Sequence, residues 1–394
     1  MRSLKQLVTV TLVGLYTIPQ RLSSSIVAVV GIAGVVVVLV AVLSIGEGFK
    51  AAMVNAGHTD RAIVMRSGAD SEMSSGLSGP ETDLIRQASG IKKIGSTPAA
   101  SAEMFVIIDV KRKTSNTDAN VPLRGVDSTV LSVRDEVKID GRMLTFGTNE
   151  VVVGRAASRQ FVGLNAGDVI RSGQLTWNVV GIFDTGGTVA ETEIWCDARI
   201  LQGAYRRGNS YQSMLVKLES PSAFDAFKDT LTRDPQLDVQ VRRESDYYAE
   251  QSRTLTGLVE TIGYGVAFLM GLGAIIGAVL TMYSAVITRT REIATLRALG
   301  FGALPVLFSI VGESLFLALV GGIAGGALAY IGFNGYQAAT MNWQTFSQVA
   351  FGFAVTPNLL MQGLIYALIM GFLGGIIPAI RAARLPISKA LREL

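Results

Sequence analysis

The sequence predicts an α+β membrane protein with four transmembrane helices and a large extracytoplasmic mixed α/β domain inserted between helices 1 and 2. Three observations lead to this fold class. The 394-residue chain is 49% hydrophobic with a mean hydropathy of +0.41, which is high for a soluble protein. Long uncharged stretches recur near both ends of the chain. A long segment of mixed composition separates the first stretch from the others.

Each predicted span is long and apolar enough to cross a bilayer as a helix. About 20 apolar residues cover the ~30 Å hydrocarbon core. Residues 26–45 and 261–288 contain no charged side chain, and residues 304–333 contain only Glu313. The predicted membrane helices are therefore 26–47, 253–288, 304–333 and 357–380.

The positions of Lys and Arg predict the orientation, because short cytoplasmic segments are enriched in these residues. Basic residues lie within the N-terminal segment 1–25, the connection 289–303 and the tail 381–394, so both termini and this connection are predicted to be cytoplasmic. The outer loop 334–356 carries no charge. The inserted domain, 48–252, is then extracytoplasmic, since long domains translocate regardless of charge.

Within the inserted domain, apolar alternation and turn residues predict two βαβ-like halves that flank a middle segment of mainly strands and turns, called the insert. The halves are about 59–111 and 206–245, and the insert is about 112–205. The predicted strands are 61–66, 103–110, 151–153, 169–171, 176–183, 214–218 and 237–241, and the predicted helices are 80–88 and 222–232.

The segments that flank the domain, 46–58 and 242–256, have approximate helical spacing and are predicted to extend the first two membrane helices as a stalk. The alternative is a pair of solvated linkers. The predicted junction and stalk residues are Glu47, Gly48, Phe49, Met53, Tyr248 and Leu255.

A short charged segment, 289–301, separates two long apolar runs. Ile293, Leu296 and Gly300, with Leu299 beside them, give one apolar face at helical spacing. Gly300 is a candidate C-cap. Further features support a helix: Arg289 and Glu292 can pair three residues apart, and Arg297 suits the negative end of the helix dipole. The alternative is an ordinary basic loop that only fixes topology.

The sequence offers no catalytic, cofactor or metal site. It lacks the phosphate-loop pattern G-x-x-x-x-G-K-[ST], and its single histidine, His58, and single cysteine, Cys196, form no zinc-ligand set. The basic residues form no aromatic-interleaved stripe typical of nucleic-acid binding. Glu313 is the one intramembrane acid, which is interpreted either as a proton or substrate contact or as a helix-packing residue near the interface.

Several motifs together resemble FtsX/MacB-type ABC transporter permeases, the mechanotransmission family. The segment 291–301 reads Arg-Glu-Ile-Ala-Thr-Leu-Arg-Ala-Leu-Gly-Phe and is similar to the family's coupling segment. The other matching segments are 43–49, 150–154, 164–168, 179–183 and 377–392.

The resemblance implies a non-catalytic membrane subunit in the bacterial inner membrane, and the missing phosphate-loop pattern predicts that no ATPase domain is fused to it. The resemblance also implies that the two flanking halves form a porter-like α/β subdomain with the β-rich segment inserted into it. ATP and magnesium would bind to a partner cytoplasmic ABC ATPase, which the coupling segment would contact. Further implied partners are a second permease copy or paralogue, a periplasmic adaptor and an outer-membrane channel. The implied ATPase-coupling residues are Arg289, Arg291, Glu292, Ile293, Leu296, Arg297, Leu299 and Gly300.

Two implied functions remain open. One is substrate export driven by periplasmic conformational change. The alternative is an FtsX-like signalling subunit that controls a periplasmic hydrolase, although the large inserted domain favours export. A secondary transporter is disfavoured, because the chain shows no inverted repeat and only one intramembrane acid.

The predicted orientation can be tested by cysteine labelling in intact cells. Cysteine at Ser115 or Thr185 should react with an impermeant thiol reagent added outside, because both positions lie in the inserted domain. Cysteine at Thr290 or Ser388 should react only after the membrane is opened. The reverse pattern would overturn the orientation.

Overall fold

The computed structural model describes residues 22–173 and 175–384. The chain folds into two compact units, each built from separate stretches of sequence. The helical unit comprises Met1–Glu47, Leu258–Tyr336 and Ala354–Leu394, and the α/β unit comprises Gly48–Gly257 and Gln337–Phe353. The predicted segment 1–25 and tail 381–394 lie largely outside the described residues.

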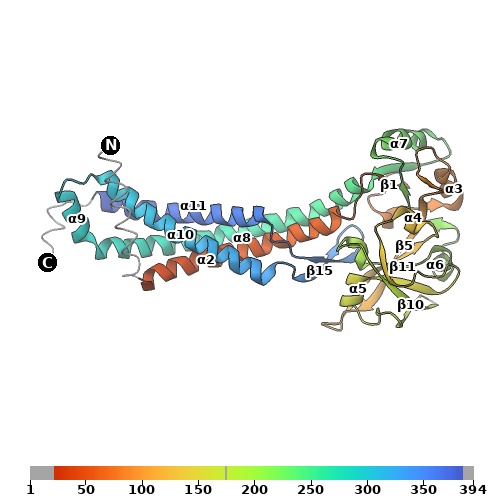
Figure 1. Cartoon of the computed structure of the whole chain (residues 1–394), viewed down its shortest axis with the longest axis horizontal. Helices are drawn as coiled ribbons and strands as arrows, with labels where there is room; N and C mark the ends of the chain where they lie inside the picture. Colours follow the sequence, from red (N-terminus) through yellow and green to blue (C-terminus); the bar gives the residue numbers. More distant parts are fainter. Residues whose placement is uncertain (1–21, 174, 385–394) are drawn as a thin grey trace. The chain divides into compact units, whose positions relative to one another are not determined.

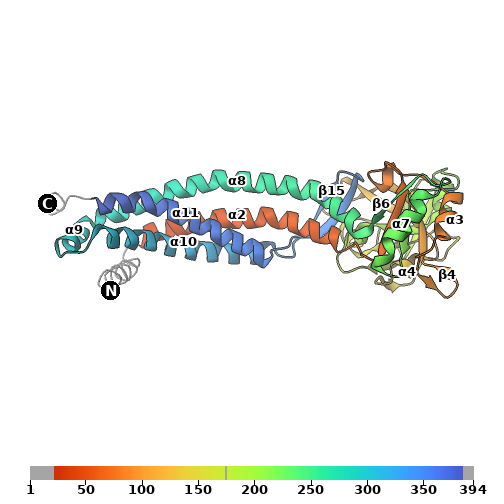
Figure 2. The ribbon, with the colours of Figure 1, turned by 90° about the horizontal axis from the view of Figure 1, so that it is seen from above.

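Four of the described helices are long and apolar enough to cross a membrane, and they run side by side in the helical unit (Figures 1 and 2). The segments predicted as a stalk are largely helical, because the first helix continues to Val54 and the second begins at Glu244. The four long helices are α2 (Leu22–Val54), α8 (Glu244–Thr288), α10 (Ala303–Phe333) and α11 (Pro357–Ala383), and the short helix α9 (Thr290–Ala298) lies between α8 and α10 in the chain.

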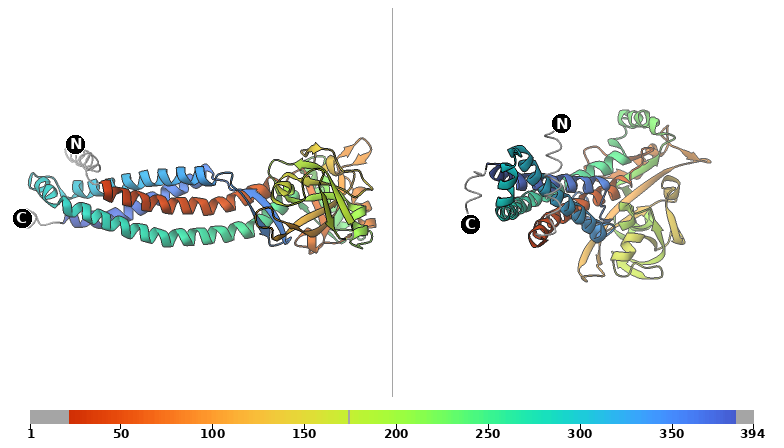
Figure 3. Two further views of the ribbon diagram at one scale, coloured as in Figure 1. Left: turned by 90° about the horizontal axis from the view of Figure 1, so that it is seen from below. Right: turned by 60° about the vertical axis from the view of Figure 1, so that its left-hand side comes forward.

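The long helices lie side by side in a further view (Figure 3, left), and glycines permit their close approach. A Cβ on Gly321 of α10 would lie 2.9 Å from the Val29 carbonyl oxygen of α2. A Cβ on Gly325, one turn later, would lie 2.6 Å from the Ala33 carbonyl oxygen. Such close backbone approach is typical of membrane helix pairs.

The α/β unit contains the strands and shorter helices that the alternating pattern predicts, with ends that differ by a few residues. Its strands are β1 (Arg61–Arg66), β2 (Leu77–Ser78), β3 (Lys93–Ile94), β4 (Thr97–Pro98), β5 (Ala100–Lys111), β6 (Asp118–Val126), β7 (Lys138–Gly141), β8 (Glu150–Gly154), β9 (Val169–Ser172), β10 (Leu175–Asp184), β11 (Ile194–Asp197), β12 (Ser210–Tyr211), β13 (Ser213–Lys217) and β14 (Val239–Arg243). Its helices are η2 (Glu72–Ser74), α3 (Gly79–Arg86), α4 (Val130–Val133), α5 (Arg155–Gln160), η3 (Val189–Thr192), α6 (Ala198–Ala204), η4 (Pro221–Ala223) and α7 (Phe224–Arg233).

The two predicted βαβ-like halves interleave to form one part of the domain, which is called the first half from here on. The strand order β14-β1-β13-β5 places β13 between β1 and β5, and β1 between β13 and β14. Neighbouring strands are antiparallel, so β1-α3-β5 and β13-α7-β14 are both split βαβ units. Helices α3 and α7 contribute Ile85, Phe227 and Leu231 to one apolar core.

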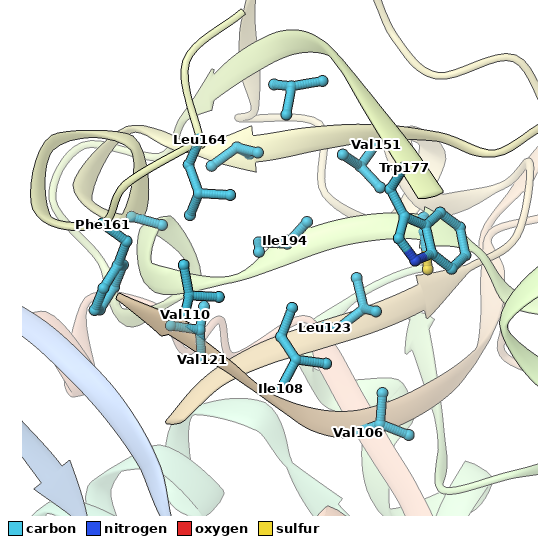
Figure 4. Close-up of a cluster of buried hydrophobic side chains, with 14 of the residues drawn as sticks. Val106, Ile108, Val110, Val121, Leu123, Val151, Phe161, Leu164, Trp177 and Ile194 are labelled. Carbon is cyan, nitrogen blue, oxygen red and sulfur yellow. The ribbon is translucent and has the colours of Figure 1, made fainter. Parts of the chain in front are cut away.

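The predicted insert, which is called the inserted half from here on, continues the same sheet through the order β6-β11-β8-β10-β7. The long strand β5 belongs to both halves, because residues 100–103 pair with β13 and residues 104–111 pair with β6. The core of this half extends from Phe161 to Trp177, with Leu123 and Ile194 between them (Figure 4).

The outer loop 334–356 contains a β-hairpin that the sequence analysis does not anticipate. Its strands are β15 (Gln337–Asn342) and β16 (Ser347–Gly352), joined by a four-residue turn between Asn342 and Ser347. The hairpin belongs to the α/β unit although α10 and α11, which it connects, belong to the helical unit. The composition of the sequence reveals the hydrophobic spans. It does not reveal this hairpin, because docking of the loop depends on residues far away in the chain.

Candidate functional site

The predicted coupling segment forms helix α9, and its C-terminus is closed by a Schellman motif. Gly300 has a φ of 95°, a left-handed conformation that glycine adopts without steric penalty. The Gly300 N–H donates to the Arg297 carbonyl at 3.1 Å, and the Phe301 N–H donates to the Leu296 carbonyl at 3.1 Å. The glycine in this motif therefore ends the helix at a defined residue.

Helix α9 has two distinct faces. Ile293 and Ala294 are buried, and Ile293 packs in a cluster with Val286 of α8, Val306 of α10 and other apolar residues of the bundle. The predicted apolar face is thus divided, because Leu296 and Arg297 are half-buried and Leu299 is 73% exposed. The exposed face consists of Arg291, Glu292, Thr295, Ala298, Leu299 and Gly300.

Arg289 lies at the start of α9 between two carboxylates. Its Nε is 3.0 Å from Glu292 Oε2, which confirms the predicted pair along the helix. Its Nη1 is 3.6 Å from Glu313 Oε2 on α10. Glu313 is 3% exposed, so this ion pair is shielded and holds the start of the coupling helix against the bundle. The contact favours the helix-packing interpretation of Glu313.

The predicted stalk residues occupy α2 and α8. Phe49 and Met53 are buried, Leu255 is 9% exposed, and Tyr248 is half-buried. Tyr248 stacks edge-on against Tyr247, with ring centroids 5.4 Å apart. Glu47 is half-buried and Gly48 is buried.

A buried charge cluster in the α/β unit was not found by sequence reasoning. Arg124 of β6 is 2% exposed and contacts three carboxylates. Its Nη1 lies 2.7 Å from Glu72 Oε1 and 2.8 Å from Glu103 Oε2, and its Nη2 lies 2.7 Å from Glu193 Oε1. Arg134 supplies a second cation to Glu103. These contacts join η2, β5, β6 and the segment after η3.

The electrostatics of this cluster favour the ionised form of Glu103. Burial alone would raise the pKa of Glu103, but Arg134 and Arg124 hold that pKa below its usual value. The cluster also reaches α8, because the Glu72 backbone N–H donates to the Tyr247 hydroxyl at 3.2 Å. The start of α8 is therefore fixed to the centre of the domain.

A second cluster lies where α8 begins. Glu244 is 2% exposed, accepts a hydrogen bond from the His58 backbone N–H at 3.1 Å, and lies 3.7 Å from Arg61 Nη1. Arg61 also pairs with Asp135 and Glu136. Burial raises the pKa of Glu244 to about 7, although the Arg61 cation opposes this shift. This carboxylate connects the segment after α2 to the start of α8.

A sequence signal for the first cluster does exist. Glu103 and Arg124 interrupt otherwise apolar strands, and charged residues inside a buried strand require partners. The identity of those partners depends on the fold.

Comparison with protein families decides the affiliation of the chain. Residues 25–234 match the model of the MacB-like periplasmic core domain, which is more than half of the sequence. Residues 264–387 match the FtsX-like permease C-terminal model. The chain belongs to the MacB/FtsX family of ABC permeases. Its α/β unit is therefore a MacB-like periplasmic domain, and its apolar helices indicate a bacterial inner-membrane protein.

Several MacB proteins are similar along most of this chain. The macrolide export ATP-binding/permease protein MacB of Bdellovibrio bacteriovorus is 22% identical over 332 residues, covering 78% of this chain and 48% of the relative. That of Nitrobacter winogradskyi is 26% identical over 390 residues, covering 92% and 56%. This permease thus spans about half the length of the curated MacB relatives that it matches.

Two further similarities concern parts of the chain. The uncharacterized ABC transporter permease YknZ of Bacillus subtilis is 28% identical over 138 residues, covering 35% of this chain and 32% of YknZ. The solved periplasmic region of MacB from Actinobacillus actinomycetemcomitans covers 49% of this chain and 92% of its own, at 14% identity and a TM-score of 0.38.

Replacing Arg124 with methionine should destabilise the permease by about 3–5 kcal/mol, because three buried carboxylates lose their shared cation. Chemical unfolding of the full chain in detergent measures the change. Arg233→Met is the control, since Arg233 forms an exposed pair with Asp229 and its removal should leave the transition near that of the wild type. Equal transitions for both variants would contradict the role of the cluster.

The titration of Glu244 should make the permease less stable as the pH rises from about 4.5 to about 7. The folded protein binds this proton more tightly than the unfolded chain does, so stability is lost through that window. The shift corresponds to about 3 kcal/mol. Glu244→Gln should remove this part of the pH dependence in unfolding experiments. His58 stays in both proteins, so its titration cancels in the comparison. A pH profile unchanged by the substitution would refute the assignment.

Proposed function

We propose that this permease couples ATP hydrolysis by a separate cytoplasmic ABC ATPase to conformational change in its periplasmic domain and thereby exports a substrate. It works as a dimer with a second permease copy or paralogue, and with a periplasmic adaptor and an outer-membrane channel. ATP and magnesium bind to the ATPase, and this chain contributes no catalytic group.

The observation that carries the proposal is the two-faced coupling helix α9. Its inner face, through Ile293, packs among the three helices α8, α10 and α11, so a force on α9 acts on the bundle directly. Its outer face exposes Leu299 together with Arg291 and Glu292. An exposed leucine beside charges of both signs is a suitable contact for a protein partner.

The continuous helices α2 and α8 carry the movement outward. Helix α8 has 45 residues and connects β14 of the periplasmic domain to the start of the coupling connection. An α-helix of this length rises about 68 Å, roughly twice the ~30 Å hydrocarbon core. The helix therefore extends beyond the membrane without an intervening loop.

Leu299→Asp and Glu292→Lys should each reduce co-purification of the ATPase at least tenfold. The first substitution introduces a charge into the docking face, and the second reverses a charge on it. Affinity purification of the tagged full-length chain from mild detergent, followed by mass spectrometry, identifies and quantifies the ATPase. Val169→Asp is the matched control, since Val169 is 58% exposed in the periplasmic domain. Wild-type recovery of the ATPase with both coupling variants would disprove docking through this face.

A further inference from the structure

The hairpin β15–β16 is anchored inside the periplasmic domain. Strand β16 is almost fully buried, with Val349 1% exposed and Phe351 3% exposed. It packs against β6 and η3 of the inserted half. A two-stranded hairpin alone is marginally stable in water, so its structure depends on this docking.

Hydrogen bonds from several elements hold the hairpin. The Ala350 N–H donates to Thr192 Oγ1 at 3.0 Å, and both groups are buried. The Asn342 side-chain amide donates to Gln251 Oε1 of α8 at 2.9 Å. Two further contacts come, like Thr192, from the inserted half: Asn120 Nδ2 donates to the Phe346 carbonyl at 2.8 Å, and Arg112 donates to Gln348 Oε1 at 2.6 Å.

The hairpin also contacts the end of α2 at a position where only glycine fits. A Cβ on Gly48 would lie 2.1 Å from the Gly352 carbonyl oxygen. The adjacent Phe49 packs edge-on against Phe351, with ring centroids 5.6 Å apart. Gly48 therefore permits α2 and β16 to lie in backbone contact.

The connections between the hairpin and the membrane helices are short. Residues 334–336 join α10 to β15, and residues 353–356 join β16 to α11. The two connections are also fastened to each other, because the Val355 N–H donates to Asn334 Oδ1 at 3.1 Å. Three or four residues span only about 10–14 Å even when extended, so they cannot absorb a large displacement.

We infer that the β15–β16 hairpin is a second mechanical link, which transmits movement of α10 and α11 to the inserted half of the periplasmic domain and remains docked during the transport cycle. The stalk helices α2 and α8 lead to β1 and β14 of the first half, whereas the hairpin contacts β6 and η3 of the inserted half. The inserted half is thus linked to α10 and α11 through the hairpin, which also contacts both stalk helices. This inference rests on the proposed function.

Docking is tested with a thiol reporter in the full-length chain. Val349→Cys should be protected from an impermeant maleimide, and Gln337→Cys, on the exposed end of β15, should react. The native Cys196 is buried, and its background is measured in the wild type. Adding Gly48→Ala should raise the labelling of Cys at position 349 at least tenfold. Gly34→Ala, on the same helix with no atom near its Cβ position, is the matched control.

Transmission is tested in the complex with the ATPase recovered as described above. Spin labels on exposed sites of the inserted half report its change on ATP trapping. Gly48→Ala should reduce that change by at least half while ATP hydrolysis continues. Thr192→Val is nearly equal in volume and removes the hydrogen-bond acceptor of the Ala350 N–H. It should also reduce the ATP-dependent change of the inserted half. Agreement between the two variants would exclude a folding defect specific to Gly48→Ala as the cause.

The outcomes separate the two hypotheses. A labelled Val349→Cys in the wild-type background, or a wild-type ATP response in an undocked Gly48→Ala complex, would overturn the inference alone. Absence of any ATP response in the wild-type complex would overturn the proposed function, and the inference with it.

Discussion

The periplasmic domain depends on the burial of Arg124 among three carboxylates. Glu72, Glu103 and Glu193 come from separate segments, and each lies within 2.8 Å of a guanidinium nitrogen of Arg124. The same cluster receives Tyr247 of α8 through the backbone of Glu72. A single guanidinium group thus determines how the sheet, the inserted half and the start of the stalk meet, with a directionality that apolar packing lacks.

The features predicted from sequence are those that depend on neighbouring residues. The stop of α9 at Gly300, the Arg289–Glu292 pair and the strand 61–66 each follow from a few adjacent positions. The long apolar spans follow from composition, and the split βαβ halves follow from alternation between strand and helix signals.

The features that sequence reasoning missed depend on distant partners. The pairing of Glu244 with Arg61, far apart in the chain, has no local signature. The hairpin lies in a stretch without charges, where Asn342 and Thr192 are ordinary polar residues until they are brought together with their partners. For α9, the pattern shows an apolar face but cannot show that Ile293 is covered by the chain's own bundle while Leu299 remains outside.

Strand β5 runs through both halves of the periplasmic domain as one piece of backbone. Any rotation of one half against the other must therefore twist this strand and the hydrogen bonds on either side of it. Strands have a preferred twist, and departures from it are resisted. The two halves are consequently joined by one unbroken strand and cannot rotate as separate bodies without distorting the sheet. In the proposed cycle, a displacement driven by ATP would distort this sheet, and relief of the distortion would favour the return movement.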